Sequence, residues 1–150
     1  MSVIDRRFDP DFFDLITGSY ARLVGKPLVP SGRNAAWLYH DASFAVLVQN
    51  GEPDPRFIYA NRAAQGCFEY SWREFLTLPS RLSADTPERA ERQSLLHRVT
   101  REGAAASYRG IRISKSGRRF RIEDGIVWQV LGADGAALGQ AATFASWTDV

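Results

Sequence analysis

The residue types that most often carry catalysis or metal binding are scarce in this chain, which has one cysteine and two histidines among 150 residues. His40 lies in an early connection without a Cys or His partner at the spacing of a metal site. No serine lies in a Gly-x-Ser-x-Gly sequence, and neither His40 nor His97 has an evident carboxylate to orient it. We therefore expect no catalytic residue and no metal site, and we predict that the protein is not an enzyme.

The strongest concentration of charge is the segment from Arg109 to Arg121, which holds six basic residues and no acidic one. If Ser116-Gly117 is a two-residue hairpin turn, Arg112 lies opposite Arg121 on the outward face of the sheet. Opposed like charges destabilise a sheet unless a negative group lies between them. Glu123, the acidic start of the first helix, a partner subunit and an anionic ligand are candidates, and a simply solvated face is the alternative. The arginines predicted to form an interaction surface are Arg112, Arg119 and Arg121.

Composition places the chain among ordinary globular domains, with 45% hydrophobic and 24% charged residues. The formal net charge of +2 does not favour nucleic acid, and the aromatic residues of the basic segment alternate inward and cannot stack on bases. The longest apolar run, Phe44 to Val48, is far shorter than the ~20 residues of a membrane span. No signal peptide begins the chain, and Cys67 has no second cysteine for an internal disulfide. We expect a cytoplasmic protein with no membrane or nucleic-acid partner.

The N-terminal part, residues 1–41, is predicted to be a helical extension of a core that spans residues 42–150. Asp9 can cap a helix that begins at Pro10, and Gly25 can end it. Three apolar residues recur on one face of this helix, and they are Phe12, Ile16 and Tyr20. A shorter helix is predicted around residues 34–39.

The core is predicted to be α+β, with three helices inserted between the second and third of five strands. The predicted strands are 44–49, 56–60, 108–114, 119–131 and 140–147, and the predicted helices are 61–68, 72–76 and 87–102, the last with Thr86 as cap and Pro87 at its first position. The first strand is apolar on both faces, so we expect it at the centre of an antiparallel sheet of order 2-1-5-4-3 with the helices packed on one face.

This element order resembles that of a PAS domain, in which an Asn such as Asn61 opens the first inserted helix. More specifically, the chain resembles the MEKHLA domain, a PAS-like module that bacteria carry as a free-standing protein and plants carry at the C-terminus of class III homeodomain–leucine zipper regulators. The matching segments are 57–61, 68–72, 78–84, 89–92, 108–114, 117–120 and 139–144. The resemblance implies a PAS-like fold and a sensory or regulatory role.

The resemblance also bears on cofactors, and it leads us to expect none. Photoreceptive PAS domains use a cysteine that adds to a flavin, and in that register this chain has Ser80, while Cys67 lies a helix too early. A hydroxyl cannot replace the thiol in such an adduct, so a flavin adduct is excluded. Haem-binding PAS domains place a histidine near the start of the long helix, whereas His97 lies late on it. We do not expect haem.

PAS modules bind small molecules between the sheet and the inserted helices, and this implies a ligand pocket for an unidentified small molecule. The predicted pocket residues are Trp72, Phe75, Ser80, Arg81, Ser83, Phe120, Trp128 and Phe144. The aromatic residues of this set can alternatively fill the core, and Arg81 can alternatively cap a helix end.

We therefore interpret the chain as a non-enzymatic PAS-like sensory or regulatory module. We expect a homodimer that forms through the sheet face and the N-terminal helix, with Phe12, Ile16 and Tyr20 at the contact. One alternative is a haem- or flavin-binding PAS sensor. Another is a small cone-fold enzyme of the ketosteroid-isomerase kind, although that fold places its helices before its strands.

Overall fold

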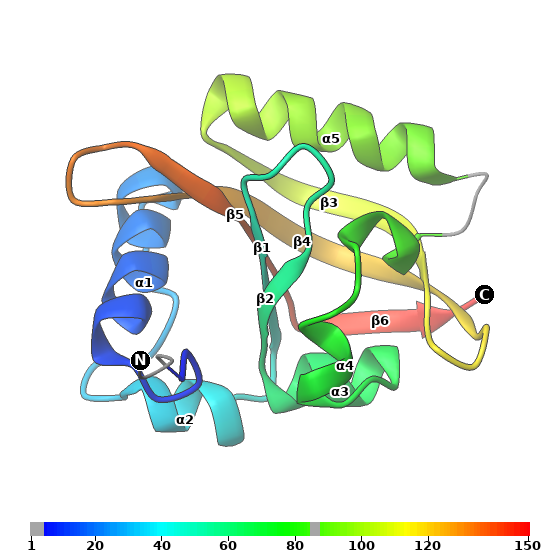
Figure 1. The fold of residues 1–150 in the computed structure, drawn as a ribbon, viewed down its shortest axis with the longest axis horizontal. Helices are drawn as coiled ribbons and strands as arrows, with labels where there is room; N and C mark the ends of the chain where they lie inside the picture. Colours follow the sequence, from blue (N-terminus) through cyan, green and yellow to red (C-terminus); the bar gives the residue numbers. More distant parts are fainter. Residues whose placement is uncertain (1–4, 85–87) are drawn as a thin grey trace.

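The computed structural model describes residues 5–84 and 88–150 (Figure 1). The predicted cap Thr86 and the predicted first helical residue Pro87 lie outside these residues. The elements are α1 Pro10–Val24, α2 Ala35–His40, β1 Ala45–Asn50, β2 Phe57–Ala60, α3 Arg62–Phe68, α4 Trp72–Phe75, the 3-10 helix η1 Ser80–Ser83, α5 Arg89–Glu102, β3 Ala104–Ile113, β4 Arg119–Leu131, β5 Ala137–Phe144 and β6 Ser146–Asp149.

The sheet is antiparallel with strand order β2-β1-β5-β4-β3, which confirms the predicted order. Residues 45–48 of β1 are buried, as expected of a strand covered on both faces. The single strand predicted at residues 140–147 is divided into β5 and β6. Both parts pair with β4, at Ile126↔Thr143 and at Ile122↔Trp147.

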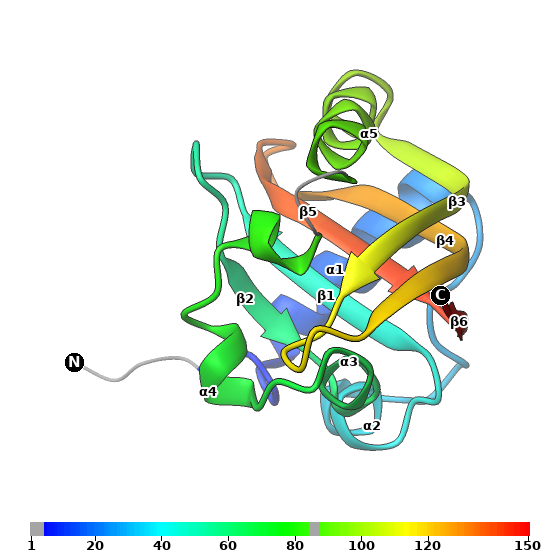
Figure 2. The same ribbon diagram turned by 90° about the vertical axis from the view of Figure 1, so that its right-hand side faces the viewer.

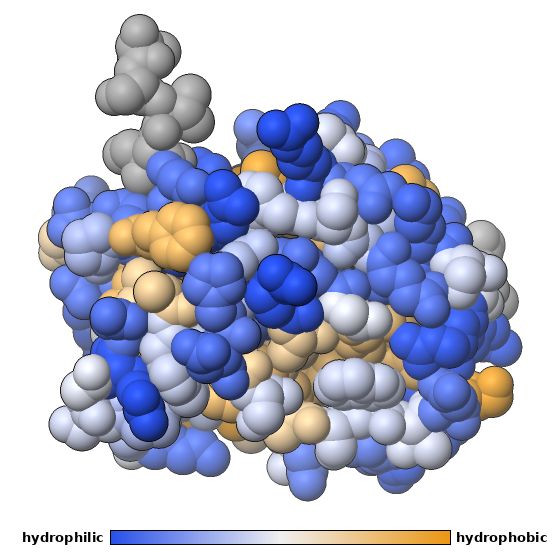
Figure 3. All heavy atoms as spheres, turned by 90° about the horizontal axis from the view of Figure 1, so that it is seen from below, coloured by the Kyte–Doolittle hydropathy of each residue, from blue (hydrophilic) through white to orange (hydrophobic). Residues whose placement is uncertain are grey.

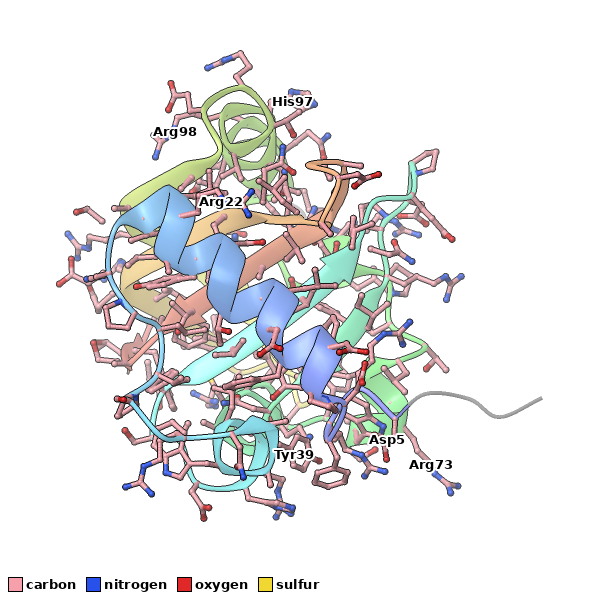
Figure 4. The ribbon with its side chains drawn as sticks, turned by 90° about the vertical axis from the view of Figure 1, so that its left-hand side faces the viewer. Asp5, Arg22, Tyr39, Arg73, His97 and Arg98 are labelled. Carbon is pink, nitrogen blue, oxygen red and sulfur yellow. The ribbon has the colours of Figure 1, made fainter. Side chains whose placement is uncertain are left out.

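Helices cover both faces of the sheet, so the core has two parts. The helices α3, α4 and α5 lie on one side, with α1 behind the sheet (Figure 2), and the view from the opposite side shows α1 lying across the strands (Figure 4). Asp9 caps α1 through bonds from the N–H groups of Asp11 and Phe12, and Gly25 ends it with φ of 87°. Within the described residues, no helix is long and apolar enough to cross a membrane.

The apolar side of α1 docks on β4 as its sequence pattern requires. Phe12, Ile16 and Tyr20 are buried, and the ring of Tyr20 packs edge-on against that of Trp128 at 4.8 Å. Ser19 Oγ accepts the N–H of Leu131 at 2.8 Å, so the last backbone donors of β4 are not left without a partner. These contacts lie within one chain.

The β3–β4 hairpin differs from the predicted one by one residue. Ser114 N–H donates to Arg118 O at 2.9 Å, which leaves a three-residue loop that ends in Gly117 at φ of 89°. A loop of this length with a left-handed third residue is a common hairpin type. Arg112 consequently pairs with Phe120 and not with Arg121, and its side chain is only 7% exposed. The prediction that Arg112 lies on the outward face is wrong, because a one-residue change of register moves a side chain to the other face.

Most of the basic segment is balanced by acids from neighbouring elements. The ion pairs are Arg109–Glu123, Lys115–Glu74, Arg118–Asp149 and Arg119–Glu88. Arg121 is half-buried opposite Ile111 and has no ion pair within residues 5–84 and 88–150. The predicted stack of opposed arginines is therefore absent from the hairpin, and the segment is largely a paired surface.

Asn61 connects the start of the inserted helices to the central strand. Its Oδ1 accepts the N–H groups of Val46 and Ala64, at 3.0 and 3.1 Å, and its Nδ2 donates to Leu38 O and Phe44 O, at 3.1 and 2.9 Å. The side chain is fully buried. It satisfies four backbone groups that would otherwise lose water without gaining a partner.

Replacing Asn61 with Ala should lower the free energy of unfolding by about 3 kcal/mol, because buried backbone groups then lose their partners. Asn34→Ala is the matched control, since Asn34 caps α2 through a single bond to Trp37 N–H from an exposed position. We expect the control to cost about 1 kcal/mol. Urea unfolding followed by circular dichroism measures both, and equal losses would contradict the assigned role of Asn61.

Deleting residues 1–25 should lower the melting temperature and cause aggregation, because the sheet face under Phe12, Ile16 and Tyr20 then meets water. Asp11→Asn should change little, because Asp11 is exposed in the first turn of α1. Scanning fluorimetry and size-exclusion chromatography test both variants. An unchanged melting temperature and an unchanged size after deletion would show that α1 does not stabilise the sheet.

Candidate ligand-binding cavity

A cavity of about 70 Å³ lies between the sheet and α5. At the ~30 Å³ that a water molecule takes in the liquid, this space is enough for about two water molecules or for a small organic group. Much of its lining is apolar and comes from Leu47, Phe57, Phe68, Leu95, Val127 and Phe144. Seven polar or charged residues also line it, and they are Gln49, Ser83, Arg92, Tyr108, Arg112, Gln140 and Thr143.

Arg92 enters the cavity from α5 because it lies on the same side of the helix as Leu95 and Val99, at spacings of three and seven residues. The side chain is 5% exposed. Its Nη2 donates to Gln49 Oε1 at 3.2 Å and to Ser80 Oγ. Burial, together with the positive charge of Arg112, lowers the pKa of Arg92 to about 10, so the group remains a cation at neutral pH.

Arg112 reaches the cavity from β3 and lies over the ring of Tyr108, with its guanidinium carbon 5.2 Å from the ring centre. Its Nη1 donates to Ile111 O at 2.9 Å. The ring of Tyr108 occupies space that only glycine leaves free, since a methyl group on Gly110 would lie 1.8 Å from Tyr108 Oη. A methyl group on Gly125 would lie 3.2 Å from the same ring. The two glycines therefore let the ring lie against the sheet below Arg112.

Neither buried guanidinium has a carboxylate partner in the part of the chain that the structure describes. Asp54, whose charge raises the pKa of Arg92, forms its own ion pair with Arg81 at 3.1 Å. Tyr108 Oη is buried and has no hydrogen-bond partner among the described residues, and burial raises the pKa of Tyr108. Two buried cations without a counter-ion are costly, so the cavity favours a negative group.

The residues predicted to line a pocket fall into three groups. Ser83 and Phe144 line the cavity, and Ser80 lies next to it and contacts Arg92. Phe75 and Phe120 are fully buried in the same half of the core and pack against Phe68 without lining the cavity.

The third group lies elsewhere. Trp128 is on the opposite face of the sheet, where its Nε1 donates to Ile16 O at 3.3 Å, so its predicted inward direction is wrong. Trp72 belongs to the same opposite half, with its ring 5.8 Å from that of Tyr59. Arg81 is exposed and paired with Asp54, and it does not line the cavity.

Sequence reasoning missed Arg92, Tyr108, Gln49 and Gln140 as cavity residues. For Arg92 the signal was present, because helical spacing places it in line with Leu95. The sequence also indicated the position of Gln140, since this residue lies in a predicted strand that pairs with the central strand 44–49. It donates to Leu96 O at 3.2 Å, while its buried Oε1 has no partner among the described residues.

The nucleophilic and metal-binding residue types lie away from the cavity. Cys67 is 2% exposed, and burial raises the pKa of its thiol to about 12. His97 is exposed on α5 next to Gln93, at 3.2 Å between Nε2 atoms (Figure 4). Outside residues 1–4 and 85–87, no group of three His, Cys, Asp or Glu side chains could hold a metal ion.

The sheet order and the helices inserted between β2 and β3 define a PAS-like fold, and solved structures agree. A PAS domain from Colwellia psychrerythraea is 16% identical with a TM-score of 0.65, over 77% of this chain and 92% of its own. A light-oxygen-voltage domain studied with a flavin analogue is 13% identical with a TM-score of 0.57, over 71% of this chain and 76% of its own. An RNA-binding light-oxygen-voltage receptor is 23% identical with a TM-score of 0.58, over 83% of this chain but 36% of its own.

A family model for the MEKHLA domain matches residues 10–149, so the chain belongs to the MEKHLA domain family. The matched range includes α1 and α2 as well as the sheet. No curated protein matches the chain.

Folded protein should react slowly with a thiol reagent such as 5,5′-dithiobis(2-nitrobenzoic acid) at pH 8. The raised pKa of Cys67 keeps nearly all of the thiol protonated, and burial blocks access. In urea the same cysteine should react at the rate of an unfolded thiol. Fast reaction of the folded protein would contradict the burial of Cys67.

Proposed function

We propose that this chain is a non-enzymatic sensory module that binds a small molecule in the cavity between the sheet and α5. The observation that carries the proposal is the cavity itself, which combines an apolar lining with two polar atoms, Tyr108 Oη and Gln140 Oε1, that lack hydrogen-bond partners among the described residues. Pockets of this kind, with few convergent polar groups, are typical of ligand sites. The cavity lies where the PAS fold encloses space between its sheet and its inserted helices.

The other candidate functions have less support. The strands β1 and β2 precede the inserted helices, whereas the cone-fold enzyme has its helices first. A flavin adduct would need a thiol near Ser80, and Cys67 is enclosed in the core. Haem would need an axial ligand, and His97 is exposed on α5 and does not line the cavity. We therefore propose a module without a flavin adduct or haem, located in the cytoplasm as its single cysteine and composition suggest.

We further propose that signalling passes through a homodimer whose contact is the outer side of α1. The expected contact through Phe12, Ile16 and Tyr20 is wrong, because these side chains are buried against the sheet of their own chain. The outer side of α1 is free to meet a second copy, because Asp11, Asp14, Gly18 and Arg22 are exposed. The contact would be largely polar, because Asp11, Asp14 and Arg22 are charged, and the exposed large apolar side chains of the described residues are Phe8, Leu138 and Val150. The face at the α2 end of the molecule is also mainly hydrophilic, with hydrophobic atoms in smaller patches (Figure 3).

Ala142→Leu tests the cavity as the binding site, because Ala142 lines it from β5 and a larger side chain would fill it. Ala137→Leu is the matched control, since Ala137 lies on the same strand and is exposed. In a fluorimetric screen of small organic compounds, those that stabilise the wild type should still stabilise Ala137→Leu but not Ala142→Leu. If no compound binds the wild type, or if Ala142→Leu binds equally well, the proposal fails.

Purified protein should be colourless above the protein absorption band, and Cys67→Ser should leave ligand binding unchanged. The reason is that the structure encloses Cys67 in the core and leaves His97 exposed. An absorption spectrum of the protein as isolated provides the measurement. A Soret band that disappears in His97→Ala would refute this prediction in favour of a haem sensor.

A further inference from the structure

We propose that the cavity binds a small monocarboxylate with an apolar body, whose carboxylate lies between Arg92 and Arg112. This inference rests on the proposed function and names the chemical class of its ligand. It would make the protein a sensor of organic acids.

The first argument is charge. Arg92 and Arg112 are 5% and 7% exposed, and each lies close enough to influence the other. Among the described acids, Asp54 acts on Arg92 but is already paired with Arg81, and Glu91, whose charge acts on Tyr108, is exposed on α5. An anion between the guanidinium groups would supply the missing counter-charge inside the protein.

The second argument is the supply of hydrogen-bond donors. The bonds that Arg92 makes to described residues leave only from Nη2, and the one that Arg112 makes leaves from Nη1. The other nitrogens of the two guanidinium groups are available as further donors, and the Tyr108 hydroxyl is buried without a hydrogen-bond partner that meets ordinary geometry among the described residues. A carboxylate has two oxygens with about four acceptor sites and fits the planar fork of a guanidinium.

The rest of the lining selects the body of the ligand. Beyond the two arginines the lining offers no further cation, since its other side chains are apolar, as Leu47, Leu95 and Phe144 are, or neutral and polar, as Gln49 and Gln140 are. A dicarboxylate would leave its other charge among these side chains, at a large desolvation cost. A single carboxylate on a short aliphatic or aromatic body satisfies both halves of the cavity.

The test compares acids with neutral molecules of the same shape. Calorimetric titration of the full chain uses acetate, butyrate and benzoate against acetamide, butyramide and benzamide, with inorganic phosphate as a separate arm. We expect the acids to bind, the two larger ones more tightly than acetate, and each amide to bind at least about tenfold more weakly than its acid, as the loss of a charged hydrogen bond predicts. Phosphate should bind weakly, because it gains nothing from the apolar lining.

Arg92→Met and Arg112→Met should each weaken benzoate binding about tenfold to a hundredfold. Without ligand, their melting temperatures should equal or exceed that of the wild type, because each variant removes a buried charge that lacks a counter-ion. A purely structural role would instead lower these melting temperatures.

Arg109→Met is the matched control on β3, since Arg109 is exposed and paired with Glu123. It should bind benzoate like the wild type. If a Met variant does not fold, Arg112→Lys keeps the charge without the fork and should bind with intermediate affinity.

The outcomes separate this inference from the proposed function. Equal binding of benzoate and benzamide, both lost in Ala142→Leu, would keep the cavity as a ligand site and overturn the carboxylate assignment. Tighter binding of phosphate than of benzoate would also overturn it. Benzoate binding that survives Ala142→Leu would place the anion outside the cavity, and absence of binding by any compound would remove both proposals.

Discussion

The length of the β3–β4 turn is the constraint on which the site depends. Three loop residues that end in Gly117 set the register in which Arg112 faces Phe120 across the hairpin. With a two-residue loop the same arginine would point to water, because the two faces of a strand alternate at every residue. The turn therefore places a cation inside the domain, beside Arg92 of α5. The glycines that make room for the ring of Tyr108 complete that arrangement.

Coverage of both sheet faces is what makes a buried, unpaired cation possible. The helix α1 closes one face through Ile16 and Tyr20, and the inserted helices close the other. Asn61 joins the two halves, since its hydrogen bonds reach β1, the end of α2 and the first turn of α3. A sheet with one open face would let water reach its strands from that side and would lower the cost of an unpaired charge.

The sequence predicted the element order and the strand order because these follow from apolar patterns and end signals that act over a few residues. The direction of single side chains was less predictable. Phe120, Ile122 and Trp128 are separated by even numbers of residues, so in a β4 without a bulge all three side chains would point to the face covered by the inserted helices. An extra residue of β4 near Asp124, at φ of 49°, inverts that phase, so Trp128 packs under α1. An arginine among the apolar residues on one side of a helix is buried only if other elements supply partners for it. For Arg92 these partners are Gln49 and Ser80, and the local sequence around Arg92 does not reveal them.

The position of Arg92 suggests how occupancy of the cavity would reach the surface. The helix α5 is mostly polar and meets the sheet through few apolar residues, chiefly Leu95 and Val99. Arg92 adds contacts to β1 and η1, but its charge opposes that of Arg112 on β3. In the empty cavity this repulsion works against the docking of α5. A bound carboxylate would turn the same pair into an attraction, so ligand and helix position would be coupled through their shared electrostatic energy. The position of α5, whose outer side carries His97 and Arg98 (Figure 4), would then depend on whether the cavity is occupied.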